Sequence, residues 1–249
     1  MKRDINWQLF LAIILVVASV TVYYIHYQIF RDPHHIFIFL VGDIAFVFTE
    51  VLLVSLIIHR VLAEREKRTR LEKVNMVIGA FFSEVGTRLL AYMSDYDPNL
   101  DNIRRELIIS GNWSEEEFNR VKKRLEDYQY KVSIENMELS QLTDFLVEKR
   151  DFLLRLLENP NVLEHEAFTE LLRSVFHLTE ELAAREDIKQ LPDTDRKHIT
   201  TDIERVYSIL VRQWLFYMKQ LKDSYPYLFS FAMRTNPFDQ TASPVLNSK

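Results

Sequence analysis

Cysteine is absent from the 249 residues of this chain. A chain without thiols forms no disulfide, offers no thiolate to a metal ion and has no cysteine nucleophile, and it fits a reducing compartment. Glycine is scarce, with four residues at Gly42, Gly79, Gly86 and Gly111. Their spacing matches neither G-x-x-x-x-G-K-[ST] nor G-x-G-x-x-G, so we expect no nucleotide site built on a glycine-rich phosphate loop.

Positive charge is also in short supply. The net charge is -5, and the residues after Lys73 hold 22 basic and 29 acidic side chains. An acidic surface repels phosphate backbones, so we expect no nucleic-acid partner. The Glu-x-x-His pairs of a di-iron bundle are missing, and His177 with Glu180 and Glu181 is interpreted as solvated surface charge. We therefore expect no catalytic residues, no enzyme activity, no cofactor and no bound metal.

Two long apolar runs dominate the start of the chain. Residues 7–30 carry no formal charge, and residues 36–58 carry only two acids. Each run exceeds the roughly 20 residues that cross a bilayer. The pattern predicts a two-span transmembrane hairpin over residues 1–62, with the lipid bilayer as partner. A cleavable signal peptide is the alternative for the first run because Val16 and Ala18 are small, but no polar region follows Ala18.

The distribution of lysine and arginine predicts the orientation of the hairpin. Lys2 and Arg3 precede the first run, and residues 59–73 after the second run hold six basic and three acidic side chains. Basic residues favour the cytoplasmic side, so both termini are expected in the cytoplasm and the location is the plasma or inner membrane. The residues predicted to contact anionic headgroups are Arg65, Lys67, Arg68, Arg70 and Lys73.

The second run carries two acids, Asp43 and Glu50, which are seven residues apart. Seven residues make nearly two helical turns, so both acids share one face about 10 Å apart along the axis. An antiparallel hairpin brings Ser19, Tyr23 and His26 of the first run to comparable depths, which predicts an intramembrane polar face. Three interpretations stay open: protonated acids that hydrogen-bond between helices, acids that line an ion or proton path, or contact with a different membrane partner.

Small residues accompany these acids. Gly42, Ala45 and Thr49 lie on the adjoining helix face, and Gly79 and Gly86 follow further along the chain. Small side chains let helices approach closely. We therefore predict helix contacts between copies of the chain and a homo-oligomer.

The rest of the chain has helical periodicity throughout. Apolar residues from Val74 to Met93 form one stripe, which predicts a juxtamembrane amphipathic helix within residues 63–95. A third transmembrane helix there is the alternative, but Glu84 and Arg88 would then lie in lipid. Residues 96–234 are predicted to form an antiparallel helical bundle around a long helix from Asp195 to Asp223, and residues 235–249 a disordered tail. The predicted fold class is all-α.

These patterns favour an integral membrane protein whose hairpin anchors a cytoplasmic helical domain. That domain is expected to act by interaction, as a sensor, scaffold or assembly subunit that associates with itself and can bind a protein partner through the bundle. The alternative is a subunit of a homo-oligomeric ion channel or proton-coupled pathway lined by Asp43 and Glu50. A third class, an enzyme with a cytoplasmic metal site, is testable by metal analysis of the purified protein.

Overall fold

The computed structural model describes residues 2–245. All regular secondary structure in this range is helical, which confirms the predicted all-α class. The chain divides into two compact units, Met1–Lys67 and Arg68–Lys249. Helix α2 (Pro33–Phe81) begins in the first unit and ends in the second.

The first unit consists of helix α1 (Lys2–Phe30) and the first part of α2. Arg31, between them, has a φ of 52°, the left-handed conformation that commonly ends a helix. Its N–H donates to the carbonyl of Tyr27 at 2.9 Å. Asp32 then accepts the N–H of His35 at 3.2 Å, and Pro33 occupies the first position of α2, where its missing N–H costs nothing.

The second unit contains the end of α2 and the remaining helices. These are the π-helical turn η1 (Phe82–Gly86), α3 (Thr87–Ser94), the 3-10 turns η2 (Leu100–Asn102), η3 (Arg104–Leu107) and η4 (Ile134–Asn136), and helices α4 (Glu115–Glu126), α5 (Leu139–Glu148), α6 (Arg150–Leu157), α7 (Pro160–Leu163), α8 (Glu166–Ala183), α9 (Asp193–Ser224) and α10 (Pro226–Arg234). The start of α4 has the capping box that Ser114 and Glu117 form reciprocally.

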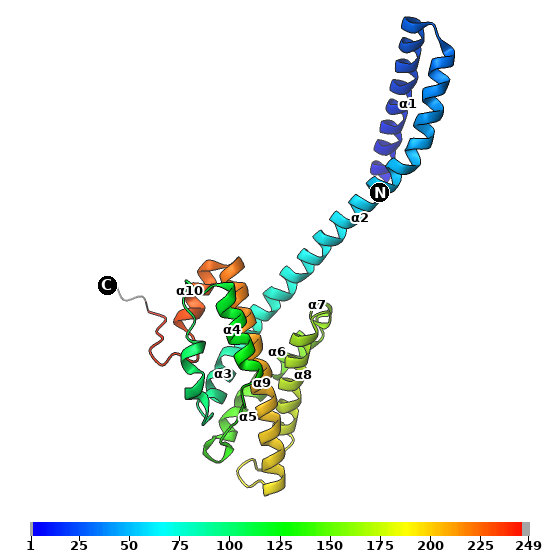
Figure 1. The fold of residues 1–249 in the computed structure, drawn as a ribbon. Coiled ribbons are helices and arrows are strands. Elements are labelled where there is room, and N and C mark those ends of the chain that lie inside the picture. The colour runs from blue at the N-terminus through cyan, green and yellow to red at the C-terminus, as the bar shows by residue number, and fades with distance from the viewer. Residues whose placement is uncertain (1, 246–249) are drawn as a thin grey trace. The chain divides into compact units, whose positions relative to one another are not determined.

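Helix α9 is the central element of the second unit. It packs against α3, α4, α8 and α10, and in Figure 1 it runs the length of this unit. Tyr207 and Trp214 are among its fully buried side chains, but Phe216 on the same helix is 45 % exposed. Packing on several sides explains why apolar residues occupy more than one face of α9.

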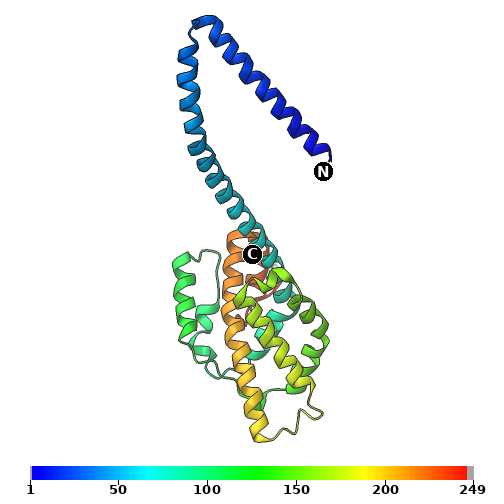
Figure 2. The ribbon, with the colours of Figure 1, turned by 90° about the vertical axis from the view of Figure 1, so that its right-hand side faces the viewer.

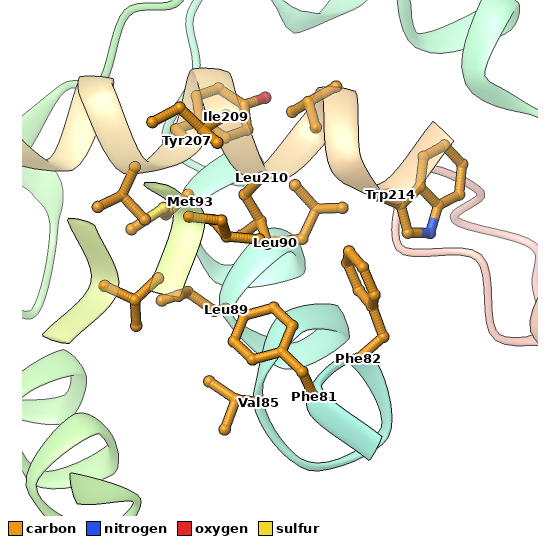
Figure 3. Packing of buried hydrophobic residues seen from close by; sticks show 14 of the residues in the cluster. Phe81, Phe82, Val85, Leu89, Leu90, Met93, Tyr207, Ile209, Leu210 and Trp214 are labelled. Atoms are coloured by element: carbon orange, nitrogen blue, oxygen red, sulfur yellow. The ribbon is translucent and has the colours of Figure 1, made fainter. Parts of the chain in front are cut away.

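The apolar stripe from Val74 to Met93 faces this core. Ile78, Phe81 and Leu89 are fully buried, and Figure 3 shows the side chains of η1 and α3 beside those of α9. The ring of Phe82 stacks on Tyr217 of α9 at 4.7 Å. The segment that the sequence places next to a membrane is therefore a structural part of the second unit.

The C-terminal segment differs from the disordered tail expected over residues 235–249. Phe238 is fully buried, and its ring lies 4.9 Å from that of Trp214. Asn236 donates its side-chain N–H to the carbonyl of Leu107 at 2.8 Å. The buried ring of Phe238 and the hydrogen-bonded amide of Asn236 hold residues 235–239 on the core, although this segment lacks helical periodicity. Residues 246–249 of the expected tail lie outside the described residues.

Candidate functional site

The first unit presents an apolar surface. Two segments are long and apolar enough to cross a membrane, one within Phe10–Phe30 and one within Pro33–Ser94, and no residue of either apolar window is buried. Phe48 is 75 % exposed and Ile29 66 %. Soluble monomers rarely expose continuous apolar surface on this scale, because each apolar side chain left in water costs free energy.

Asp43 and Glu50 lie on this apolar surface. Both side chains are exposed, and neither has a hydrogen bond or an ion pair with the described residues. Helices α1 and α2 diverge from the turn in Figure 2, and among the described residues no hydrogen bond or ion pair joins either acid to Ser19, Tyr23 or His26. Two apolar helices placed in lipid would have no hydrophobic drive to pack against each other.

The polar residues next to the turn do meet. The ring of His26 stacks on that of His35 with 6.2 Å between centroids and 6° between planes. The Nδ1 atom of His26 is buried without a hydrogen-bond partner among the described residues. Tyr23, one turn earlier, is half-buried, and Ser19 is exposed.

The small residues predicted at helix contacts fall into two groups. A Cβ added to Gly42 would meet no heavy atom within 4 Å among residues 2–245, and Ala45 and Thr49 beside it are exposed, so this face is open. Gly86 is different, because a Cβ there would lie 2.6 Å from the Phe82 ring and 2.8 Å from the Phe81 ring. Gly79 is half-buried, with Tyr217 at 3.9 Å from such a Cβ. The rings of Phe81 and Phe82 therefore cover Gly86 within the second unit.

The basic residues predicted to contact headgroups are all exposed. They are Arg65, Lys67, Arg68, Arg70 and Lys73. Arg68 pairs with Glu72 at 3.3 Å on the same helix, and Arg70 pairs with Glu164 at 3.1 Å. Exposed pairs of this kind contribute little to stability, about 0–1 kcal/mol each.

A groove of about 490 Å³ lies between α4, α8 and α9. Its apolar lining includes Phe118, Leu215 and the half-exposed Phe216, and its charged lining has both signs, with the basic residues Lys122, Arg212 and Lys219 and the acidic residues Glu126 and Glu170. A second groove, of about 520 Å³, is lined by residues of α2, η1, α9 and α10, among them Gly79 and Tyr217. Apolar grooves with charged margins are typical of protein-binding surfaces.

The aromatic segment from Tyr225 to Phe238 borders the second groove. Phe229 and Phe238 are buried, whereas Tyr227 is 72 % exposed and Phe231 is 51 % exposed. The segment therefore both packs on the core and presents aromatic surface.

A histidine and carboxylate cluster lies between α8 and α9, which are joined by residues 184–192 and run in opposite directions in Figure 1. Nε2 of His177 and Nε2 of His198 each lie 3.4 Å from Oδ2 of Asp202. Oε2 of Glu181 lies 3.5 Å from Nε2 of His198, and Oε1 lies 3.9 Å from Nε2 of His177. We call these four residues the α8–α9 cluster.

Two arginines flank the α8–α9 cluster. Arg185 bonds Oε2 of Glu181 at 3.0 Å and both carboxylate oxygens of Asp195, and Arg205 lies 3.1 Å from Oδ1 of Asp202. The hydrogen bond from Arg185 is the main reason why the pKa of Glu181 lies below its usual range. Glu181 therefore remains a carboxylate.

The sequence pattern that encodes the α8–α9 cluster is a histidine four residues before an acid, repeated on two successive helices. The sequence alone favours solvated surface for His177 and Glu181, and it does not single out His198 and Asp202. The i, i+4 spacing puts each pair on one helix face, but only the packing of α8 on α9 unites the two pairs. As the side chains stand, no group of three or more His, Asp or Glu within residues 2–245 is arranged to hold a metal ion.

Two family models match this chain. The model described as MJ1433, N-terminal helical domain, matches residues 2–62, and the model described as uncharacterized protein MJ1433, C-terminal helical domain, matches residues 70–234. The chain belongs to the MJ1433 family. A relative from Methanocaldococcus jannaschii, uncharacterized protein MJ1433, is 48 % identical over 237 residues, which cover 95 % of each chain. No solved structure matches.

The family descriptions agree with the architecture, since they divide the chain into an N-terminal and a C-terminal helical domain. They name no ligand and no activity.

Proposed function

We propose that this protein is an integral membrane protein in which α1 and the first part of α2 cross the bilayer and anchor a cytoplasmic helical domain that acts by interaction. The observation that carries the proposal is the exposure of both apolar windows, of which no residue is buried. The second unit has a hydrophobic core of its own, so these helices are not needed to fill it. Lipid is the environment in which such a surface is stable.

The charge distribution supports the proposed orientation. The segment after the second span is rich in lysine and arginine, and all five of its predicted headgroup residues are exposed. Positively charged flanks are retained on the cytoplasmic side and attract anionic lipid. Both termini and the second unit are accordingly assigned to the cytoplasm.

The proposed activity of the second unit is binding. Its groove between α4, α8 and α9 combines the half-exposed Phe216 with three basic and two acidic side chains, which suits an amphipathic helix whose apolar face lies in the groove and whose charged margins meet both signs. We include self-association in the proposal because the small-residue face at Gly42, Ala45 and Thr49 is open to a second copy.

Membrane fractionation tests the anchor directly. The expected result is that the full chain stays with the membrane after washing with alkaline carbonate and is released only by detergent. A tag on the C-terminus should be protected from protease in intact cells and accessible after lysis. A chain released by carbonate, or a tag cleaved in intact cells, contradicts the proposal.

A second candidate is a homo-oligomeric channel or proton-coupled pathway. The observation that favours it is the pair Asp43 and Glu50, which stand without partners among the described residues on an apolar helix, where carboxylates are costly. Liposomes that contain the purified protein separate the two candidates. Cation or proton flux that is lost in Asp43→Asn and Glu50→Gln supports a channel, and a monomer in nanodiscs rules out a homomeric pore.

A further inference from the structure

The α8–α9 cluster contains the donor set of a transition-metal site. Two imidazole nitrogens and two carboxylates, from His177, Glu181, His198 and Asp202, come from two adjacent helices. Zn²⁺ in proteins is bound by thiolate, imidazole and carboxylate groups. This chain has no cysteine to supply a thiolate, so imidazole and carboxylate are the ligands it can offer.

The spacing between the donor atoms matches tetrahedral coordination. With metal to ligand bonds of about 2.0–2.2 Å, two ligands of a tetrahedral ion lie about 3.3–3.6 Å apart. Nε2 of His177 and Nε2 of His198 each lie 3.4 Å from Oδ2 of Asp202, and Nε2 of His198 lies 3.5 Å from Oε2 of Glu181. The other oxygen of Glu181, Oε1, lies 3.9 Å from Nε2 of His177, which is a few tenths of an ångström too long.

The state of Asp202 is a second and independent observation. Its side chain is 3 % exposed, and its Oδ2 atom has no hydrogen-bond partner among the described residues, although two imidazole nitrogens lie 3.4 Å away. Neither nitrogen is therefore aligned to donate a hydrogen bond to Oδ2. A buried carboxylate oxygen without a hydrogen-bond partner costs free energy. Ligand atoms that all point toward a shared ion lie close together without forming hydrogen bonds to one another, which is the arrangement seen at Oδ2.

The two arginines leave one oxygen of each carboxylate available. Arg205 lies against Oδ1 of Asp202, the oxygen that the imidazoles do not approach, and Arg185 bonds Oε2 of Glu181. Outer contacts of this kind orient carboxylate ligands. Oδ2 of Asp202 is thus left for an ion, and Glu181 can reach it through Oε1 after a small rotation, or through Oε2 if that oxygen is shared between Arg185 and the ion.

We propose that His177, Glu181, His198 and Asp202 bind one divalent transition-metal ion, with Zn²⁺ as the best fit, and that this ion joins α8 to α9. In the present conformation these four side chains are not arranged around a metal ion, so binding requires small side-chain rotations. The imidazoles have room for them, since the side chains of His177 and His198 are 48 % and 51 % exposed. The site lies within the second unit and is independent of the membrane anchor.

Metal titration of the full chain tests this assignment. The purified protein in detergent is stripped with a chelator and titrated with ZnCl₂ in a calorimeter. We expect one ion per chain, a higher Tm of the protein with Zn²⁺, and a loss of affinity of about 100-fold or more in His177→Gln and in His198→Gln. Both substitutions replace half-exposed side chains, and circular dichroism confirms that the variants are folded.

The matched control is the double variant His34→Gln/His35→Gln, which removes two histidines from the other place where imidazoles gather and leaves the α8–α9 cluster intact. Its affinity for Zn²⁺ should equal that of the unmodified chain. Replacement of Zn²⁺ by Co²⁺ should give the intense visible absorption of a tetrahedral ion. The proposal is overturned if the unmodified chain binds no ion, if His177→Gln and His198→Gln bind as tightly as the unmodified chain, or if only the control loses binding.

Discussion

The two units of this protein use the same apolar residues in opposite ways. Phe48 of α2 is 75 % exposed, whereas Phe168 of α8 is fully buried. Both are phenylalanines within helices, and neither helix contains a break at these positions. The difference teaches that helix formation is decided locally, whereas the burial of an apolar side chain depends on what else in the structure can cover it.

The largest expected effect follows from separating the units. A chain limited to residues 68–249 should be water-soluble, helical and cooperative in thermal unfolding, because its core lies within this range. The full chain should remain with the membrane. Centrifugation and circular dichroism measure both properties, and an insoluble or unfolded fragment would show that the first unit supplies part of the core.

Truncation of one phenylalanine in each unit sharpens the comparison. Phe168→Ala should lower the free energy of unfolding of the second unit by about 3–5 kcal/mol, because it leaves a cavity in a closed core. The control Phe48→Ala removes the same atoms from an exposed position and should leave that value unchanged. Denaturant unfolding followed by tryptophan fluorescence provides the measurement, since Trp214 is buried beside this core.

Two glycines allow a smaller and more local test. Gly86→Ala should destabilise the second unit by about 1–3 kcal/mol, because the new methyl group would lie 2.6 Å from the ring of Phe82. Gly111→Ala, in the same unit, places its new Cβ in open space and should change the stability far less. Equal effects of the two substitutions in a thermal melt would contradict the close packing around Gly86.

The smallest expected effect concerns a helix end. Ser114→Ala removes the hydroxyl that accepts the N–H of Glu117 and should cost about 1 kcal/mol. Ser208→Ala lies inside α9, where alanine is a better helix former, and should not lower the stability. A loss of stability confined to Ser114→Ala in chemical denaturation confirms that the capping box holds the start of α4.

Much of the fold was predictable from local patterns. The all-helical class, the buried stripe from Val74 to Met93, the capping box at Ser114 and the central role of the long helix near Asp195–Asp223 all follow from helical periodicity and end signals. Such signals act along one helix at a time, so a single sequence contains them.

Other features could not be predicted from the sequence. Phe238 lies in a segment without periodicity and is buried because its ring packs against Trp214 on the core. Phe216 has the spacing of a core residue of α9 and is 45 % exposed, because it lines the groove between helices. Both outcomes depend on which neighbours surround the site, and periodicity within one helix contains no information about them.

By itself, the sequence determined which segments form helices, where the two apolar runs lie and which of them carries Asp43 and Glu50, because these depend on the order of neighbouring residues. Only the tertiary structure decided that Gly86 is covered by the rings of Phe81 and Phe82. It also decided that His177 and Glu181 meet His198 and Asp202. The physical reason is that two short patterns on different helices acquire a common geometry only when the burial of α8 against α9 fixes the register between them.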